Sequence, residues 1–142
     1  MTTIALSSTA APRWGRSVAA VLAGLVVNAV LSSATDLLLV AAGVFPPLSE
    51  FGHPASFSDS LLLLALLYRT AYGVLGCYIT ARLSPRRPMA HAMVLGGIGF
   101  AIGVIGAAAT WGEWTSWYSL AIIVVTLPSA WLGGWMNERN FR

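Results

Sequence analysis

The positions of eight arginines constrain the fold of this 142-residue chain, which contains no lysine. Four long apolar segments divide the sequence, at about residues 17–43, 60–83, 88–110 and 116–136. Seven arginines lie before the first segment, between the second and third, or after the fourth: Arg13, Arg16, Arg82, Arg86, Arg87, Arg139 and Arg142. The other two connections contain none. Because positive residues concentrate in cytoplasmic loops, this pattern predicts four membrane spans with both termini in the cytoplasm.

The composition supports lipid as the solvent of this chain. Hydrophobic residues make up 57% and charged residues only 9%, whereas soluble domains carry roughly 25% charged residues. Each segment is long enough to cross a hydrocarbon core of about 30 Å as a helix, and helices satisfy their own backbone in lipid. We expect an all-α, up-down four-helix bundle as one transmembrane domain over residues 13–138. Residues 1–12 are expected to be a disordered cytoplasmic N-terminus, not a cleaved signal peptide, and residues 139–142 a cytoplasmic tail.

Polar residues form a stripe along the first predicted span. Asn28, Ser32 and Asp36 are four residues apart, with Thr35 beside them, which places them on one side of a helix. The eighth arginine, Arg69, lies inside the second span. Asp36 and Arg69 are both about 10–14 Å from the same side of the membrane, at 1.5 Å per residue.

Two charges of opposite sign at the same depth predict an ion pair between Asp36 and Arg69, with bidentate geometry as one option. Tyr72, on the same helical face as Arg69, is expected to be available as a hydrogen-bond donor to the pair. One interpretation is structural, because a matched pair fixes helix register and keeps both charges out of lipid. The other is a proton or substrate site, as is common for ionisable groups inside membranes.

Small residues suggest where the helices approach one another. The third span contains Gly96, Gly99, Gly103 and Gly106, and the fourth contains Gly133. Small residues at four-residue spacing allow close helix packing in membranes. We expect these faces to join spans three and four, with a dimer or a partner helix as the alternative. The short connection between spans two and three, SPRRP, likewise predicts an antiparallel hairpin.

No catalytic constellation or cofactor motif appears in the sequence. Glu50 and His53 stand three residues apart in the first external connection, but two ligands make a poor metal site. We therefore predict no metal, no cofactor and no nucleic-acid partner, and expect membrane lipid to contact the protein. Cys77 is a lone cysteine and is expected to pack as a small hydrophobic residue. Tryptophan and tyrosine at both predicted membrane boundaries indicate interfacial anchoring.

Two segments, YRTAYGVLGCYITARLSPRRPMAHA and LPSAWLGGWM, resemble those of small, uncharacterised four-span inner-membrane proteins of bacteria. The resemblance covers roughly residues 60–135, rests on a general pattern, and implies no activity. It implies a location in the bacterial cytoplasmic membrane.

At the level of the sequence two functions are favoured over a third, an integral-membrane enzyme acting on lipid or quinone. The first is a non-enzymatic membrane protein that acts by helix association, as an accessory or assembly subunit of a larger complex or as a homo-oligomer. The alternative is a small dimeric transporter or channel that uses the polar stripe, Asp36 and Arg69, with Pro128 as a break in the fourth span.

Overall fold

The computed structural model describes residues 14–53 and 56–140, and it is all-α. Its long helices are α1 (Trp14–Ala41), α2 (Asp59–Leu83), α3 (Pro88–Ala109) and α4 (Ser116–Arg139), and a short 3-10 helix, η1 (Leu48–Glu50), follows α1. The predicted up-down bundle is confirmed, with span boundaries within three residues of those expected. The expectation about residues 1–12, like Arg13 and Arg142, lies outside the described residues.

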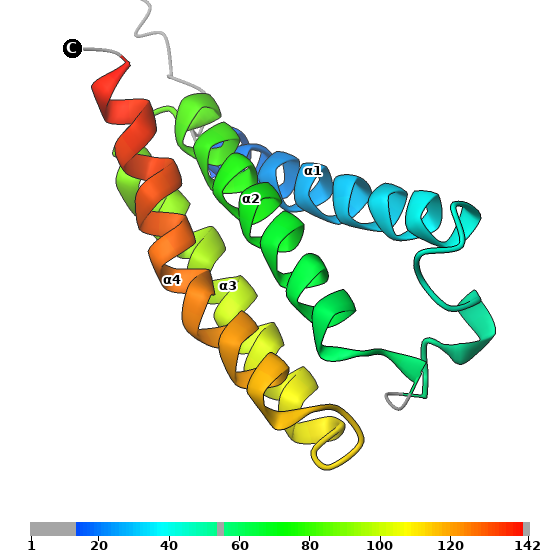
Figure 1. Ribbon diagram of the computed structural model, residues 1–142. Helices are drawn as coiled ribbons and strands as arrows, with labels where there is room; N and C mark the ends of the chain where they lie inside the picture. Colours follow the sequence, from blue (N-terminus) through cyan, green and yellow to red (C-terminus); the bar gives the residue numbers. More distant parts are fainter. Residues whose placement is uncertain (1–13, 54–55, 141–142) are drawn as a thin grey trace, which may run out of the picture.

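Alternate helices run in opposite directions, so the start of α1, the α2–α3 turn and the end of α4 lie at one end of the bundle (Figure 1). We call it the arginine end, because Arg16, Arg82, Arg86, Arg87 and Arg139 lie there. The turn is tight: Arg87 adopts a left-handed backbone with φ 50°, and Pro88 begins α3. Helix α2 packs against both α1 and α4, while α3 packs mainly against α4.

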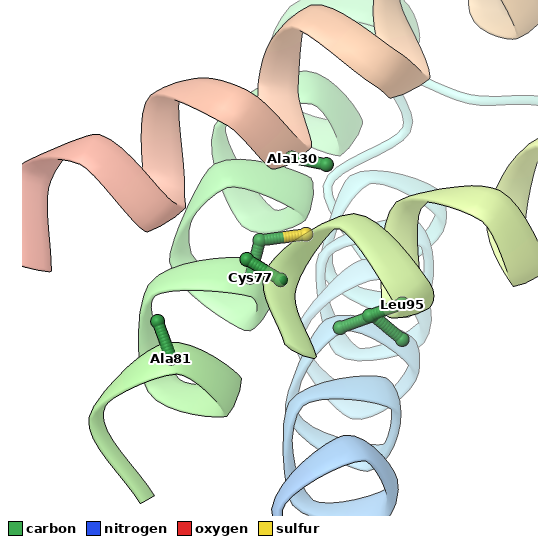
Figure 2. Packing of buried hydrophobic residues seen from close by; sticks show 5 residues of the cluster. Cys77, Ala81, Leu95 and Ala130 are labelled. Atoms are coloured by element: carbon green, nitrogen blue, oxygen red, sulfur yellow. The ribbon is translucent and has the colours of Figure 1, made fainter. Parts of the chain in front are cut away.

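Small residues bring the helices together in the half of the bundle near the arginine end. A Cβ atom on Gly76 of α2 would lie 2.7 Å from the carbonyl oxygen of Gly24 in α1. Thr80 is fully buried and donates a hydrogen bond to the Ala20 carbonyl of α1, at 3.1 Å. A buried cluster joins α2, α3 and α4 here (Figure 2), and its members are Cys77, Ala81, Ala92, Leu95 and Ala130. Close packing in this half thus depends on side chains that occupy little volume.

Toward the opposite end, α1 diverges from the other helices (Figure 1). The α1–α2 connection bridges the gap with a cluster of rings that reaches the α3–α4 connection. Successive ring centroids are 5.4–6.4 Å apart, in edge-to-face or tilted contacts, through Phe45, Phe51, Phe57, Trp114 and Tyr118. We call these five residues the aromatic cluster and this end the aromatic end. Trp117 adds a hydrogen bond to Asp59, the first residue of α2, at 2.9 Å.

The outer surface of the bundle is apolar. Exposed side chains along the helices include Val26, Val30, Leu38, Leu67, Ile105 and Val124. All four helices are long and apolar enough to span a membrane. Since exposed aliphatic side chains at this density require a lipid solvent, the chain is a multi-pass membrane protein whose helices contact lipid.

Candidate intramembrane ligand site

An ion pair between α1 and α2 lies in the half of the bundle where α1 diverges. Arg69 Nη2 donates a hydrogen bond to Asp36 Oδ2 at 2.7 Å. Arg69 is ten residues from the first residue of α2, which corresponds to about 15 Å along the helix. The two residues that sequence depth places at one level therefore do meet. One hydrogen bond joins them, and the bidentate option is wrong.

The tyrosine that bonds this pair is not the one expected from the sequence. The Tyr68 hydroxyl donates a hydrogen bond to Asp36 Oδ1. The Tyr72 hydroxyl instead forms a hydrogen bond of 3.0 Å with Thr35 Oγ1. The helical-face argument favoured Tyr72 because it is three residues from Arg69. Tyr68 was not among the residues expected at the pair, and its phenol reaches sideways to the adjacent helix. The tyrosine rings lie 5.9 Å apart and flank the pair.

The polar stripe of α1 changes its surroundings along the helix. Gly24, one helical turn before the stripe, contacts Gly76 and Thr80 of α2. Members of the stripe itself line a cavity of about 420 Å³ between α1 and the other three helices. We call it the polar cavity. Asn28, Ser32, Asp36 and Arg69 are among its lining residues. Asn28 Oδ1 is buried and has no hydrogen-bond partner in the described residues.

Other hydroxyls near the cavity are already bonded to their own helices. Thr126 and Ser129 of α4 donate to backbone carbonyls four residues earlier, at 2.7 and 2.6 Å, and Thr35 does so to Leu31 at 2.9 Å. Among the described polar residues that line the cavity, Asn28, Ser32, Ser33 and the ion pair are the ones without such a bond to their own helix. Toward the arginine end the cavity reaches Cys77 and Leu95, which belong to the buried cluster.

A second cavity, of about 370 Å³, lies toward the aromatic end. All five residues of the aromatic cluster line it, so we call it the aromatic cavity. Arg69, Gly103 and Ile122 line both cavities. The guanidinium therefore lies at the boundary between a polar chamber and an apolar one. Nothing in the sequence spacing indicated this, because the aromatic cluster comes from two separate connections and the first turn of α4.

Most of the predicted glycine positions face other helices of the same chain. A Cβ on Gly99 would lie 3.2 Å from Thr126, and one on Gly103 would lie 3.3 Å from Ile123, so both face α4 as expected. Gly96 faces Ala130 of α4. Gly133 differs from the expectation, since its closest neighbours are Val74 and Cys77 of α2, at 2.5 and 2.8 Å. A Cβ on Gly106 would have no atom of another helix within 4 Å.

The remaining candidates do not form a site. Over residues 14–53 and 56–140, no group of three or more His, Cys, Asp or Glu is close enough to hold a metal ion. Helix α4 continues through Pro128, which is exposed and is not among the residues that line either cavity. Pro128, the predicted break in the fourth span, therefore does not line the polar cavity, although its neighbour Ser129 does.

The site can bind a polar or charged group in an otherwise apolar environment. It presents one carboxylate, one guanidinium, an amide and several serine and threonine hydroxyls within a single chamber. Searches against known protein families, characterised proteins and solved structures found no match to this chain.

Proposed function

We propose that this protein is a small membrane transport protein that binds a polar solute in the polar cavity. The observation that carries the proposal is that the Asp36–Arg69 pair lines a chamber rather than being enclosed by packed side chains. Ligand sites in proteins are concave and mostly apolar, with a few polar groups that fix the ligand. A volume of about 420 Å³ falls in the range of small-molecule pockets, roughly 300–1,000 Å³.

A purely structural ion pair would be expected in different surroundings. The arginine-end half holds its helices together with glycine contacts and a hydrogen bond from Thr80 to the Ala20 carbonyl. The side chain of Asp36 is 15% exposed, whereas that of Arg69 is 36% exposed. A charge left partly open inside a membrane protein is costly and is typical of a substrate or ion pathway.

The orientation that we propose follows from the arginine bias. The arginine end faces the cytoplasm of a bacterial cell, so the aromatic cavity faces the exterior. Ala29, Ser33 and Ile102 line the polar cavity and are exposed, so the cavity opens between α1 and α3. A second copy of the chain in the membrane would close this opening, and we propose a homodimer as the functional unit.

The test is whether water reaches the polar cavity. Ser32 is replaced by cysteine in a Cys77→Ala background, in membranes, and treated with a charged, water-soluble thiol reagent. A thiol must ionise to react, so only a hydrated position is modified. We expect Cys at position 32 to react. The matched control is Val30→Cys, which lies two residues away on α1, is 58% exposed, and is not among the cavity-lining residues. Cysteine at position 30 should stay unmodified because it faces lipid. If cysteine at position 32 also stays unmodified, the proposal is rejected.

Association with a larger complex is the second candidate. It is favoured by Gly97 of α3, which has open space around its Cβ position, lines neither cavity and so could receive a partner helix. The support is narrower than the sequence indicated, because Gly96, Gly99, Gly103 and Gly133 contact other helices of the same chain. The mass of the protein extracted in native lipid discs distinguishes the two: a stoichiometric larger partner favours an accessory subunit, and a homodimer favours transport.

A further inference from the structure

Arg69 has unused hydrogen-bonding capacity on the side that already bonds Asp36. A guanidinium carries five N–H donors, and Nε with Nη2 forms a side-on fork that matches two carboxylate oxygens. Asp36 occupies only Nη2. Arg69 Nε is buried and has no hydrogen-bond partner in the described residues. The Asp36 carboxylate thus uses one of the two donors of this fork, whose geometry fits an oxyanion.

The charges at the site restrict what can join this arrangement. Asp36 is the only carboxylate and Arg69 the only cation among the described residues that line the two cavities. The other titratable side chains that face the pair or the cavities are Tyr68 and Tyr72 of α2, Tyr118 of α4 and Cys77 of α2. Helix α3 contributes no titratable side chain to either cavity.

The resting pair is electrically neutral. An anion that bound to Arg69 while Asp36 stayed ionised would leave a net negative charge inside the membrane, and uncompensated charge there is strongly unfavourable. Neutrality is kept if a proton enters with the anion. The protonated Asp36 then carries no charge, and the anion takes its place opposite Arg69.

We propose that the site binds an organic anion with a flat apolar body together with one proton, and that Asp36 occupies the anion position in the empty protein. This rests on the proposed transport function. A proton from water adds to Asp36 Oδ2, which ends the charge-assisted bond from Arg69 Nη2. The ligand carboxylate then accepts hydrogen bonds from Nη2 and Nε of Arg69. Tyr68 remains bonded to Asp36 Oδ1 throughout.

The apolar body of the ligand is inferred from the aromatic cavity. Arg69 lies at the boundary of that cavity, and the aromatic cluster forms its walls. Ring centroids from Phe57 to Phe45, Phe51 and Trp114 are 5.4–5.7 Å apart, so the surface offers ring edges and faces to a planar guest. The volume, about 370 Å³, exceeds that of one ring with a carboxylate. An aromatic monocarboxylate is therefore the simplest member of the class.

The test is calorimetric titration of the full chain in lipid discs with sodium benzoate, between pH 5 and pH 8. Repeating it in buffers of different ionisation enthalpy counts the protons taken up. We expect one proton per benzoate. Where Asp36 is ionised in the empty protein, linkage then weakens binding about tenfold for each pH unit of increase. Binding without proton uptake, or no binding anywhere in this range, would overturn the proposal. So would comparable binding of benzylamine, which presents a cation on the same ring.

Variants separate the roles of the two residues. Asp36→Asn mimics the protonated acid, so benzoate should bind to it with no proton uptake and little dependence on pH. Arg69→Gln should lose binding. Because Arg69→Gln leaves Asp36 unpaired and can fail to fold, Arg69→Lys is the second variant: it keeps the charge but lacks the fork, and we expect binding at least tenfold weaker. Arg86→Gln, in the α2–α3 turn, is the charge-matched control and should bind as the unmodified protein does. Retention of the pH slope in Asp36→Asn would contradict the assignment of the proton.

Failure of this inference can be distinguished from failure of the proposed function. If cysteine at position 32 reacts but benzoate does not bind with a proton, the cavity is hydrated and only the ligand class is wrong. If cysteine at position 32 is silent, the cavity is dry and both proposals fail.

Discussion

The two halves of this bundle are held together in different ways. Near the arginine end, glycine and alanine allow backbone-to-backbone contact, and the buried side chains are small. Beyond Asn28 and Gly73, α1 leaves the bundle, and the contacts between helices become an ion pair, two tyrosines and a cluster of rings. In the first half the helices pack closely against one another, and a pocket lies only at its outer end, beside Arg82 and Asn137. In the second half the helices line two open chambers. The same four helices thus combine a packed support with an open site.

The largest expected effect on stability comes from breaking the ion pair in the open half. Arg69→Gln leaves the Asp36 carboxylate alone, and we expect the free energy of unfolding to fall by about 3 kcal/mol, the lower end for buried pairs because Arg69 is partly exposed. The loss should be smaller at acid pH, since protonation of Asp36 removes the unpaired charge. Asp36→Asn combined with Arg69→Gln should cost less than the sum of the single changes. Thermal melting in detergent at several pH values measures this, and strict additivity would mean that the pair contributes no coupling.

A smaller effect is expected from adding one methyl group to the packed half. A Cβ on Gly133 would lie 2.5 Å from the Val74 carbonyl oxygen and 2.8 Å from the Tyr78 amide nitrogen of α2. Because backbone atoms cannot move aside singly, Gly133→Ala should destabilise the fold by about 1–3 kcal/mol. Gly106→Ala in the open half is the matched control.

Gly106 has nothing near its Cβ position, and alanine is the better helix former, by up to about 1 kcal/mol. The melting temperature of the Gly106→Ala variant should therefore stay the same as that of the unmodified protein or rise. Equal destabilisation by the two alanine substitutions would remove the distinction between a packed and an open half.

The smallest expected effects come from single hydrogen bonds in each half. Thr80→Val removes the bond to the Ala20 carbonyl, in a fully buried position, and should cost about 1 kcal/mol. Tyr72→Phe removes the bond to Thr35 beside the cavity, where water can replace it, and should cost less, about 0.5 kcal/mol. Melting temperatures of the two variants rank these losses, and a larger loss for Tyr72→Phe would indicate that the open half is dry.

The fold follows from the sequence because one signal repeats four times. Apolar runs with few charges fix the number and length of the helices, and short connections fix which of them are antiparallel. The meeting of Asp36 with Arg69 could also be predicted, because depth along a membrane helix can be counted in residues. Both inferences need only distances counted in residues along the sequence.

What the sequence did not indicate depends on how far apart the helices lie. Tyr68 reaches Asp36 because α1 and α2 are spaced to admit a phenol between them. Gly133 faces α2 rather than α3 because α4 packs in the groove between them. The aromatic cavity requires two connections, far apart in the chain, to meet at Phe57 and Trp114. Spacing along one helix determines a face, but not the neighbour that the face meets.

The measurement that tests the account most directly is hydrogen–deuterium exchange along α1 in lipid discs. Residues 18–24 lie in the packed half and residues 28–36 line or border the polar cavity, and both stretches lie within α1 (Trp14–Ala41). We predict faster exchange of backbone amides over residues 28–36, because water in the cavity reaches that part of the helix. Equal, strong protection over both stretches would show that the two halves are packed alike, and would contradict the account.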